Sequence, residues 1–337
     1  MTIERSDGGW DASRRRVLGM LGAGGLCAVS PWTFAAQSAG AWPERPINYV
    51  VPFPPGGLTD VAARQVGKAL SDAEKWNVVV ENKPGGSANI GASHVARAAA
   101  DGYTWLAITL THVANVTLFE SKAGYDLMKD LTPIAGLASC GMMVVVNPKS
   151  DIKTLDDLTR VAKTRNLSAG SSGSGTPPHL ALALFESLTG VSMTHAPYKG
   201  GAPSLVDLMG GHLDVIFSNY PESLPHVKSG ALRALAVTAK ARTPDLPDVP
   251  TVGEAGMPGL IVDNFTGVLA PANTPPHIVQ QAGKAIVEQM SRPEMKQAMV
   301  QLGFAPQPRG PAEFRTYLDS EVVRWRKIIQ DAKISVG

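Results

Sequence analysis

Residues 49–60 read YVVPFPPGGLTD, and the rest of the chain is best understood from this stretch. Branched apolar residues predict a buried strand over 47–53, which Pro52 and Pro54 end. Two glycines follow, and apolar residues then recur at helical spacing over 61–70. Glycine lets the backbone come close to a ligand and turn its N–H groups toward it. Turn geometry alone also favours Gly and Pro. The other turns of the chain must therefore be considered before this one is interpreted as a ligand site.

Outward from this stretch, short apolar strands alternate with helical patterns. Strands over 76–82 and 102–109 with a helix between them predict a β-α-β-α-β unit, and therefore a parallel sheet covered on both faces. Residues 134–148, interrupted by two glycines, predict a crossing into a second lobe in which the alternation restarts. Residues 264–271 predict the strand that returns to the first lobe, and helices complete the C-terminal part.

Four strand-to-helix turns combine glycine with small hydroxyl residues. They lie at 54–60, 84–92, 169–180 and 197–209. The N-terminus of a helix carries unpaired N–H groups and about half a positive charge, so it binds an anion without any arginine. In open α/β sheets such turns lie at the carboxyl ends of the strands, where ligands bind. Two lobes facing each other would place two turns from each around one cleft.

Composition excludes several other functions. The 337 residues carry a formal net charge of +2, and no basic stripe predicts nucleic-acid binding. No two histidines are three or four residues apart, so no metal site is expected. The dinucleotide fingerprint and the P-loop are both missing, and GSSGSG at 170–175 does not fit a nucleophile elbow. We therefore expect no cofactor.

The N-terminus predicts export. Arg14, Arg15 and Arg16 precede a short apolar, glycine-rich segment that resembles a twin-arginine signal. Residues 1–41 are therefore expected to form an export signal peptide, and the protein is expected in the periplasm.

The order of these motifs resembles a known family. VVPFPPGGLTD, VVVENKPGGSANIGA, SAGSSGSGTPPHL and PYKGGAPSLVDLMGGHLDV look like the Bug-type substrate-binding proteins, the extracytoplasmic receptors of tripartite tricarboxylate transporters. The resemblance implies an α/β, two-lobed periplasmic binding protein of type II (Venus flytrap), each lobe a mainly parallel sheet flanked by helices. Lobe I would comprise 42–139 and 265–337, and lobe II 140–264.

The resemblance also implies ligand-binding positions, mostly backbone and hydroxyl groups. By motif position these are Phe53, Gly57, Leu58, Thr59, Asp60, Asn89, Thr109, Thr111, His112, Ser171, Ser172, Gly173, Thr176, Tyr198, Gly200 and Asn219. The ligand would be a small carboxylate, delivered by a monomeric receptor to membrane permease subunits. The family commonly has a small residue where Leu58 stands, so Leu58 predicts an apolar wall.

Two alternatives remain at this stage. A hydrolase or isomerase in the same cleft would use Asp60 or His179 as its acid or base. A sensor would instead present the ligand-bound form to a signalling kinase. We expect a binding protein and not an enzyme, because no motif in the chain specifies a nucleophile.

Overall fold

A computed structural model describes residues 42–336, so the expected export signal at 1–41 lies outside the described residues. The strands are β1 (Ile47–Val51), β2 (Val78–Asn82), β3 (Thr104–Thr109), β4 (Leu131–Val146), β5 (Ser168–Ser171), β6 (Thr194–Pro197), β7 (Val215–Asn219), β8 (Arg233–Val237), β9 (Asp263–Pro271) and β10 (Ala305–Arg309). The helices are α1 (Leu58–Glu74), α2 (Asn89–Ala96), α3 (Leu110–Leu118), η1 (Glu120–Ala123), α4 (Leu155–Ala162), α5 (Pro177–Thr189), α6 (Gly201–Gly210), α7 (Tyr220–Lys228), α8 (Pro276–Ser291), α9 (Pro293–Gln301) and α10 (Pro311–Asp331).

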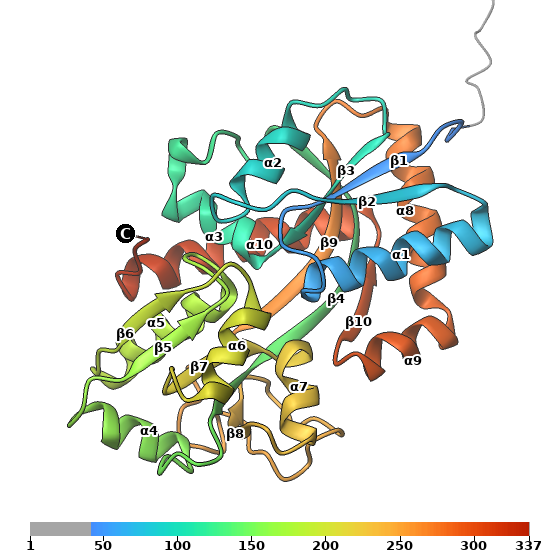
Figure 1. Cartoon of the computed structure of the whole chain (residues 1–337). Coiled ribbons are helices and arrows are strands. Elements are labelled where there is room, and N and C mark those ends of the chain that lie inside the picture. Colours follow the sequence, from blue (N-terminus) through green and yellow to red (C-terminus); the bar gives the residue numbers. More distant parts are fainter. Residues whose placement is uncertain (1–41, 337) are drawn as a thin grey trace, which may run out of the picture. The chain divides into compact units, whose positions relative to one another are not determined.

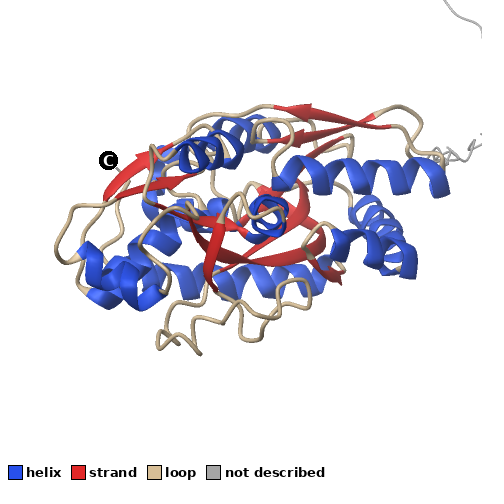
Figure 2. Ribbon diagram, turned by 60° about the horizontal axis from the view of Figure 1, so that its bottom comes forward, coloured by secondary structure: helices blue, strands red, loops and turns tan. Residues whose placement is uncertain are grey.

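The first lobe contains the expected parallel unit. β1 pairs in parallel with β2 and with β3, and β9 returns antiparallel to β3. β1 is buried except for Asn48, because helices cover both faces of the sheet, and Figure 2 shows helices on either side of the strands. The β-α-β-α-β prediction is confirmed.

The second lobe repeats the pattern. β5 pairs in parallel with β6 and with β7, while β7 and β8 both run antiparallel to β4. Figure 1 shows β5, β6 and β7 with α4 to α7 in the lower part of the molecule, away from β1, β2 and β3. The two-lobed α/β fold is therefore the one that the sequence predicted.

β4 and β9 belong to both lobes. They pair antiparallel from Leu131 opposite Pro271 to Gly141 opposite Asp263, and Figure 1 shows both running from the upper to the lower part. The two glycines predicted to interrupt this segment do not break it. β4 is one strand of 16 residues, and its register against β9 shifts between Pro133 and Ala135 and between Gly136 and Ala138.

Helix faces follow the predicted periodicity in most places. The apolar stripe of α10 is buried at Phe314, Leu318, Val322, Trp325 and Ile329, with Tyr317 partly buried beside it. Two apolar residues on these helices are exposed, namely Ile90 on α2 and Leu188 on α5. No helix within residues 42–336 is both long enough and apolar enough to span a bilayer.

Candidate functional site

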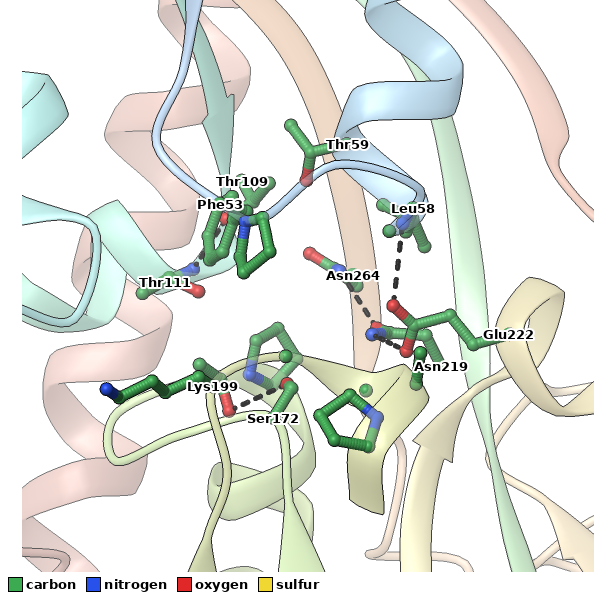
Figure 3. Close-up of a pocket in the computed structure, with 18 of the residues that line it drawn as sticks. Phe53, Leu58, Thr59, Thr109, Thr111, Ser172, Lys199, Asn219, Glu222 and Asn264 are labelled. Atoms are coloured by element: carbon green, nitrogen blue, oxygen red, sulfur yellow. Dashed lines mark hydrogen bonds between the residues drawn. The ribbon is translucent and has the colours of Figure 1, made fainter. Parts of the chain in front are cut away.

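The N-termini of several helices surround one pocket, which we call the central pocket. It encloses about 80 Å³ and is shown in Figure 3. It is lined by Phe53, Pro54, Pro55, Gly57, Leu58, Thr59, Thr109, Thr111, Ser172, Thr176, Pro177, Lys199, Gly200, Gly201, Ala202, Pro203, Asn219, Glu222 and Asn264. These residues include the first turns of α1, α3, α5, α6 and α7. Five helix N-termini therefore direct their positive ends toward one space.

A second space, the neighbouring pocket, shares part of this lining. It encloses about 400 Å³ and has Phe53, Pro54, Ser172, Thr176, Lys199 and Gly200 in common with the central pocket. The turn at residues 84–88 also lines it. Three of the four predicted glycine-rich turns thus reach the central pocket, and the fourth reaches the neighbouring one.

The β1–α1 turn is held by Asp60. Gly56 adopts the left-handed φ of +80° that the turn requires, and its N–H donates to the carboxylate of Asp60 at 3.0 Å. Arg64 and Asn82 also donate to that carboxylate. Burial alone would raise the pKa of Asp60, but these hydrogen bonds and the Arg64 charge outweigh it and the pKa is lowered. Asp60 is therefore a buried anion that supports the turn.

The start of α3 forms the second wall. Thr109 caps the helix, and its N–H donates to Nδ1 of His112 at 3.1 Å. A peptide N–H can only donate, so this hydrogen bond requires an unprotonated Nδ1, which also lies 3.3 Å from the carbonyl oxygen of Thr109. Burial lowers the pKa of His112 to about 4. Thr111 lines the central pocket, is fully buried, and its Oγ1 has no hydrogen-bond partner among residues 42–336.

The turns of the second lobe supply hydroxyl groups. Ser172 donates to Thr176, which donates in turn to the carbonyl of Gly173 at 2.6 Å. Thr176 is the N-cap of α5, and Pro177 is the first residue of the helix. Gly200 caps α6 with φ +110°, a conformation that other residues rarely adopt.

A chain of hydrogen bonds crosses the floor of the central pocket. Leu110 N–H donates to Oδ1 of Asn264, and Nδ2 of Asn264 donates to Oδ1 of Asn219 at 3.0 Å. Nδ2 of Asn219 donates to Oε2 of Glu222 at 2.9 Å, and Oε1 of Glu222 accepts from Leu58 N–H at 3.4 Å (Figure 3). The chain links α3 and α1 in one lobe to α7 in the other.

Glu222 and Lys199 are the charged residues among those that line the central pocket. Lys199 is exposed, whereas Glu222 is only partly accessible. Burial raises the pKa of Glu222, and the hydrogen bonds from Asn219 and Leu58 oppose that effect.

The structure brings most of the predicted positions together. Those that line the central pocket are Phe53, Gly57, Leu58, Thr59, Thr109, Thr111, Ser172, Thr176, Gly200 and Asn219. Gly173 and Tyr198 line the neighbouring pocket. Asp60, Asn89, His112 and Ser171 line neither. Leu58 is buried within the hydrophobic cluster that contains Ala62, while its N–H faces Glu222.

Other lining residues were missed by the sequence analysis. Lys199, Gly201, Ala202 and Pro203 lie within the quoted 197–209 turn, so the turn was found but its contributing residues were not. Glu222 and Asn264 also line the pocket, but neither lies in a glycine-rich turn that the sequence analysis identified. The helix that carries Glu222 was not recognised, because Pro221 and Pro225 obscure its pattern.

The groups considered for catalysis have structural partners. Asp60 is paired with Arg64, and Nδ1 of His179 accepts from Gly175 N–H at 3.1 Å. Burial, with a smaller contribution from His195 stacked 4.2 Å away, lowers the pKa of His179 to about 4. Within residues 42–336 no cluster of three His, Cys, Asp or Glu residues is arranged to hold a metal ion.

Comparison with known proteins gives the family. Residues 62–334 match the model of the tripartite tricarboxylate transporter family receptor. The chain belongs to this receptor family. Protein BugT of Bordetella pertussis (strain Tohama I) is 33% identical over 310 residues, which cover 91% of this chain and 95% of BugT. The chain is therefore a solute-binding receptor of the Bug type and not an enzyme.

Solved structures of such receptors are similar. Rpa4515 of R. palustris, solved with adipate, gives a TM-score of 0.84 at 35% identity, covering 87% of this receptor and 99% of that chain. MatC of Rhodopseudomonas palustris, solved with malate, gives a TM-score of 0.80 at 30% identity, covering 85% of this receptor and 99% of MatC. Both of those proteins were thus solved with a small carboxylate.

Proposed function

We propose that this receptor captures a small carboxylate in the central pocket, between its two lobes, and delivers it to the permease subunits of a tripartite tricarboxylate transporter. The observation that carries the proposal is the convergence of helix N-termini from both lobes on one pocket that holds few charged side chains. Such an arrangement stabilises an anion through main-chain N–H groups and helix dipoles. The N-terminal segment supports a periplasmic location, reached by the twin-arginine route, and we propose that the receptor acts as a monomer.

Capture requires the lobes to move. We propose lobe I as residues 42–139 and 265–337 and lobe II as 140–264, which places the hinge where β4 and β9 leave one lobe for the other. Ser139 pairs with Phe265, and Cys140 with Asn264, so the two crossings are neighbours in one ladder. A pair of adjacent strands can bend together as one hinge.

A ligand favours the closed form only if it contacts both lobes, because a population shift requires differential affinity. Thr59 and Thr111 line the central pocket from lobe I, and Ser172, Thr176 and Asn219 line it from lobe II. A carboxylate held between these groups would tie the lobes together. Release at the permease would then follow from reopening.

The test is a thermal-unfolding screen of the purified protein with small mono-, di- and tricarboxylates. A ligand at 100 times its dissociation constant stabilises the folded state by about 2.7 kcal/mol, which is a readily measured shift in melting temperature. Thr111→Val, which removes the unpartnered hydroxyl, should weaken the best ligand by about tenfold, the equivalent of about 1.4 kcal/mol. Thr316→Val, on the exposed face of α10, should not. No stabilisation by any carboxylate would refute the proposal.

A further inference from the structure

Glu222 places a carboxylate of the protein where a ligand carboxylate was expected. It lies in the first turn of α7, in lobe II, and its side chain reaches the first turn of α1, in lobe I. Oε1 accepts from Leu58 N–H at 3.4 Å, and a Cβ built on Gly57 would lie 3.7 Å from that oxygen. Figure 3 shows this contact bridging the pocket.

A third helix also approaches the carboxylate. A Cβ built on Gly201, the first residue of α6, would lie 2.7 Å from Cδ of Glu222. The backbone at the start of α6 therefore leaves room for the carboxylate only because residue 201 is glycine. The N-termini of α1, α6 and α7 all lie beside Glu222, and each carries a partial positive charge. This end of the pocket is already occupied by the carboxyl group of Glu222.

The amide groups on the pocket floor are oriented toward Glu222. Oδ1 of Asn264 accepts from two backbone N–H groups, those of Leu110 and Phe265, so its amide nitrogen must face Asn219. Oδ1 of Asn219 accepts that bond, so its own amide nitrogen faces Glu222. The last acceptor in this chain of hydrogen bonds is therefore the carboxylate of Glu222, which the protein itself supplies.

The other end of the pocket has a donor without a partner. Thr111 lies at the N-terminus of α3, is fully buried, and its hydroxyl has no hydrogen-bond partner in the described part of the chain. Buried hydroxyl groups nearly always have a partner. The hydroxyl therefore indicates where a polar group of the ligand binds.

We propose that Glu222 determines the ligand class: the pocket takes a monocarboxylate whose far end carries a hydrogen-bond donor, such as an ammonium or hydroxyl group, and discriminates against a second carboxylate. The ligand carboxylate lies at the Thr111 end, and the donor group faces Glu222. A second carboxylate beside Glu222 would place like charges together in a poorly solvated site. This inference rests on the proposed function and narrows it.

The experiment compares ligands of equal length that differ only at one end. Dissociation constants are measured by calorimetry for adipate, 6-hydroxyhexanoate and 6-aminohexanoate, and for succinate, 4-hydroxybutyrate and 4-aminobutyrate. Wild-type protein is expected to bind the best donor-ended acid of a set at least tenfold more tightly than the dicarboxylate. Glu222→Gln keeps the shape of the side chain and removes its charge, so this ratio should fall at least tenfold.

Glu288→Gln is the matched control, because Glu288 is exposed on α8 and lines neither pocket. It should keep the wild-type ratio. A wild-type preference for the dicarboxylate, or a ratio that Glu222→Gln leaves unchanged, overturns the role of Glu222 while leaving a carboxylate receptor intact. If no acid of either set binds to any of the three proteins, the proposed function fails and this inference fails with it. The wild-type ratio alone decides the matter if Glu222→Gln does not fold.

Discussion

Protonation of His112 should destabilise this receptor in mild acid. Burial lowers the pKa of His112 from 6.5 to about 4 in the folded state. Nδ1 accepts from Thr109 N–H at 3.1 Å, so adding a proton there would also break the capping box of α3. Between pH 6.5 and 4 the unfolded chain binds the proton more readily than the folded one. Stability therefore falls as the pH decreases through this window.

The size of the effect follows from the two pKa values. One pKa unit corresponds to about 1.4 kcal/mol. The pKa difference of His112 between the folded and unfolded states therefore lowers the free energy of unfolding by about 3 kcal/mol once both states are protonated. At pH 5, where the unfolded state is protonated and the folded state is mostly not, the loss attributable to His112 is about 2 kcal/mol. That is a large part of a typical domain stability of about 5–15 kcal/mol.

The assay is urea unfolding at pH 8 and pH 5, followed by tryptophan fluorescence. Glutamine at position 112 can accept the Thr109 N–H bond in the usual capping-box manner but does not titrate. The loss of stability between the two pH values should therefore be smaller by about 2 kcal/mol in His112→Gln than in wild type. His277→Gln is the control, because His277 is exposed on α8. An equal pH dependence in wild type and His112→Gln would refute the reasoning.

Two further predictions concern packing. Gly267→Ala would put a Cβ 2.5 Å from Cε1 of Phe314 and 2.8 Å from a backbone oxygen, so it should destabilise the protein by about 1–3 kcal/mol. Gly253→Ala, whose Cβ would only make an ordinary contact of 3.7 Å with Thr251, should keep the wild-type melting temperature. An unchanged melting temperature for Gly267→Ala would contradict the packing. Cys140 is buried, and burial raises the pKa of its thiol, so in a Cys27→Ser background a thiol reagent should modify it only in denaturant. Rapid modification of the native protein would show that β4 opens at the hinge.

Much of the fold could be predicted from the sequence because its signals are local. Strand β1 and the turn after it, together with the N-cap and first residue of α5, depend on residues that are neighbours in the chain. The glycine-rich turns were found for the same reason. Their approximate positions were then enough to indicate a ligand site at the carboxyl ends of the strands.

The helices that carry the less obvious parts of the site were missed. α3 and α7 follow their strands directly, without a glycine-rich turn, and α7 contains a proline in its interior. Nothing local distinguishes Glu222 from a solvated glutamate on a helix. Ile90 and Leu188 are apolar but exposed, because helical spacing identifies a face of a helix and does not show whether a neighbouring element covers that face.

The sequence by itself determined the alternation of strands and helices, apart from α3 and α7, and the four strands that end in a glycine-rich turn, because these depend on contacts over a few residues. Only the tertiary structure decided which turns meet and what lies between them. Leu58 and Glu222 are 164 positions apart in the chain, and they come together because β4 and β9 pair through both lobes and set α1 opposite α7. The charge of the pocket therefore depends on long-range strand pairing, which no local pattern encodes.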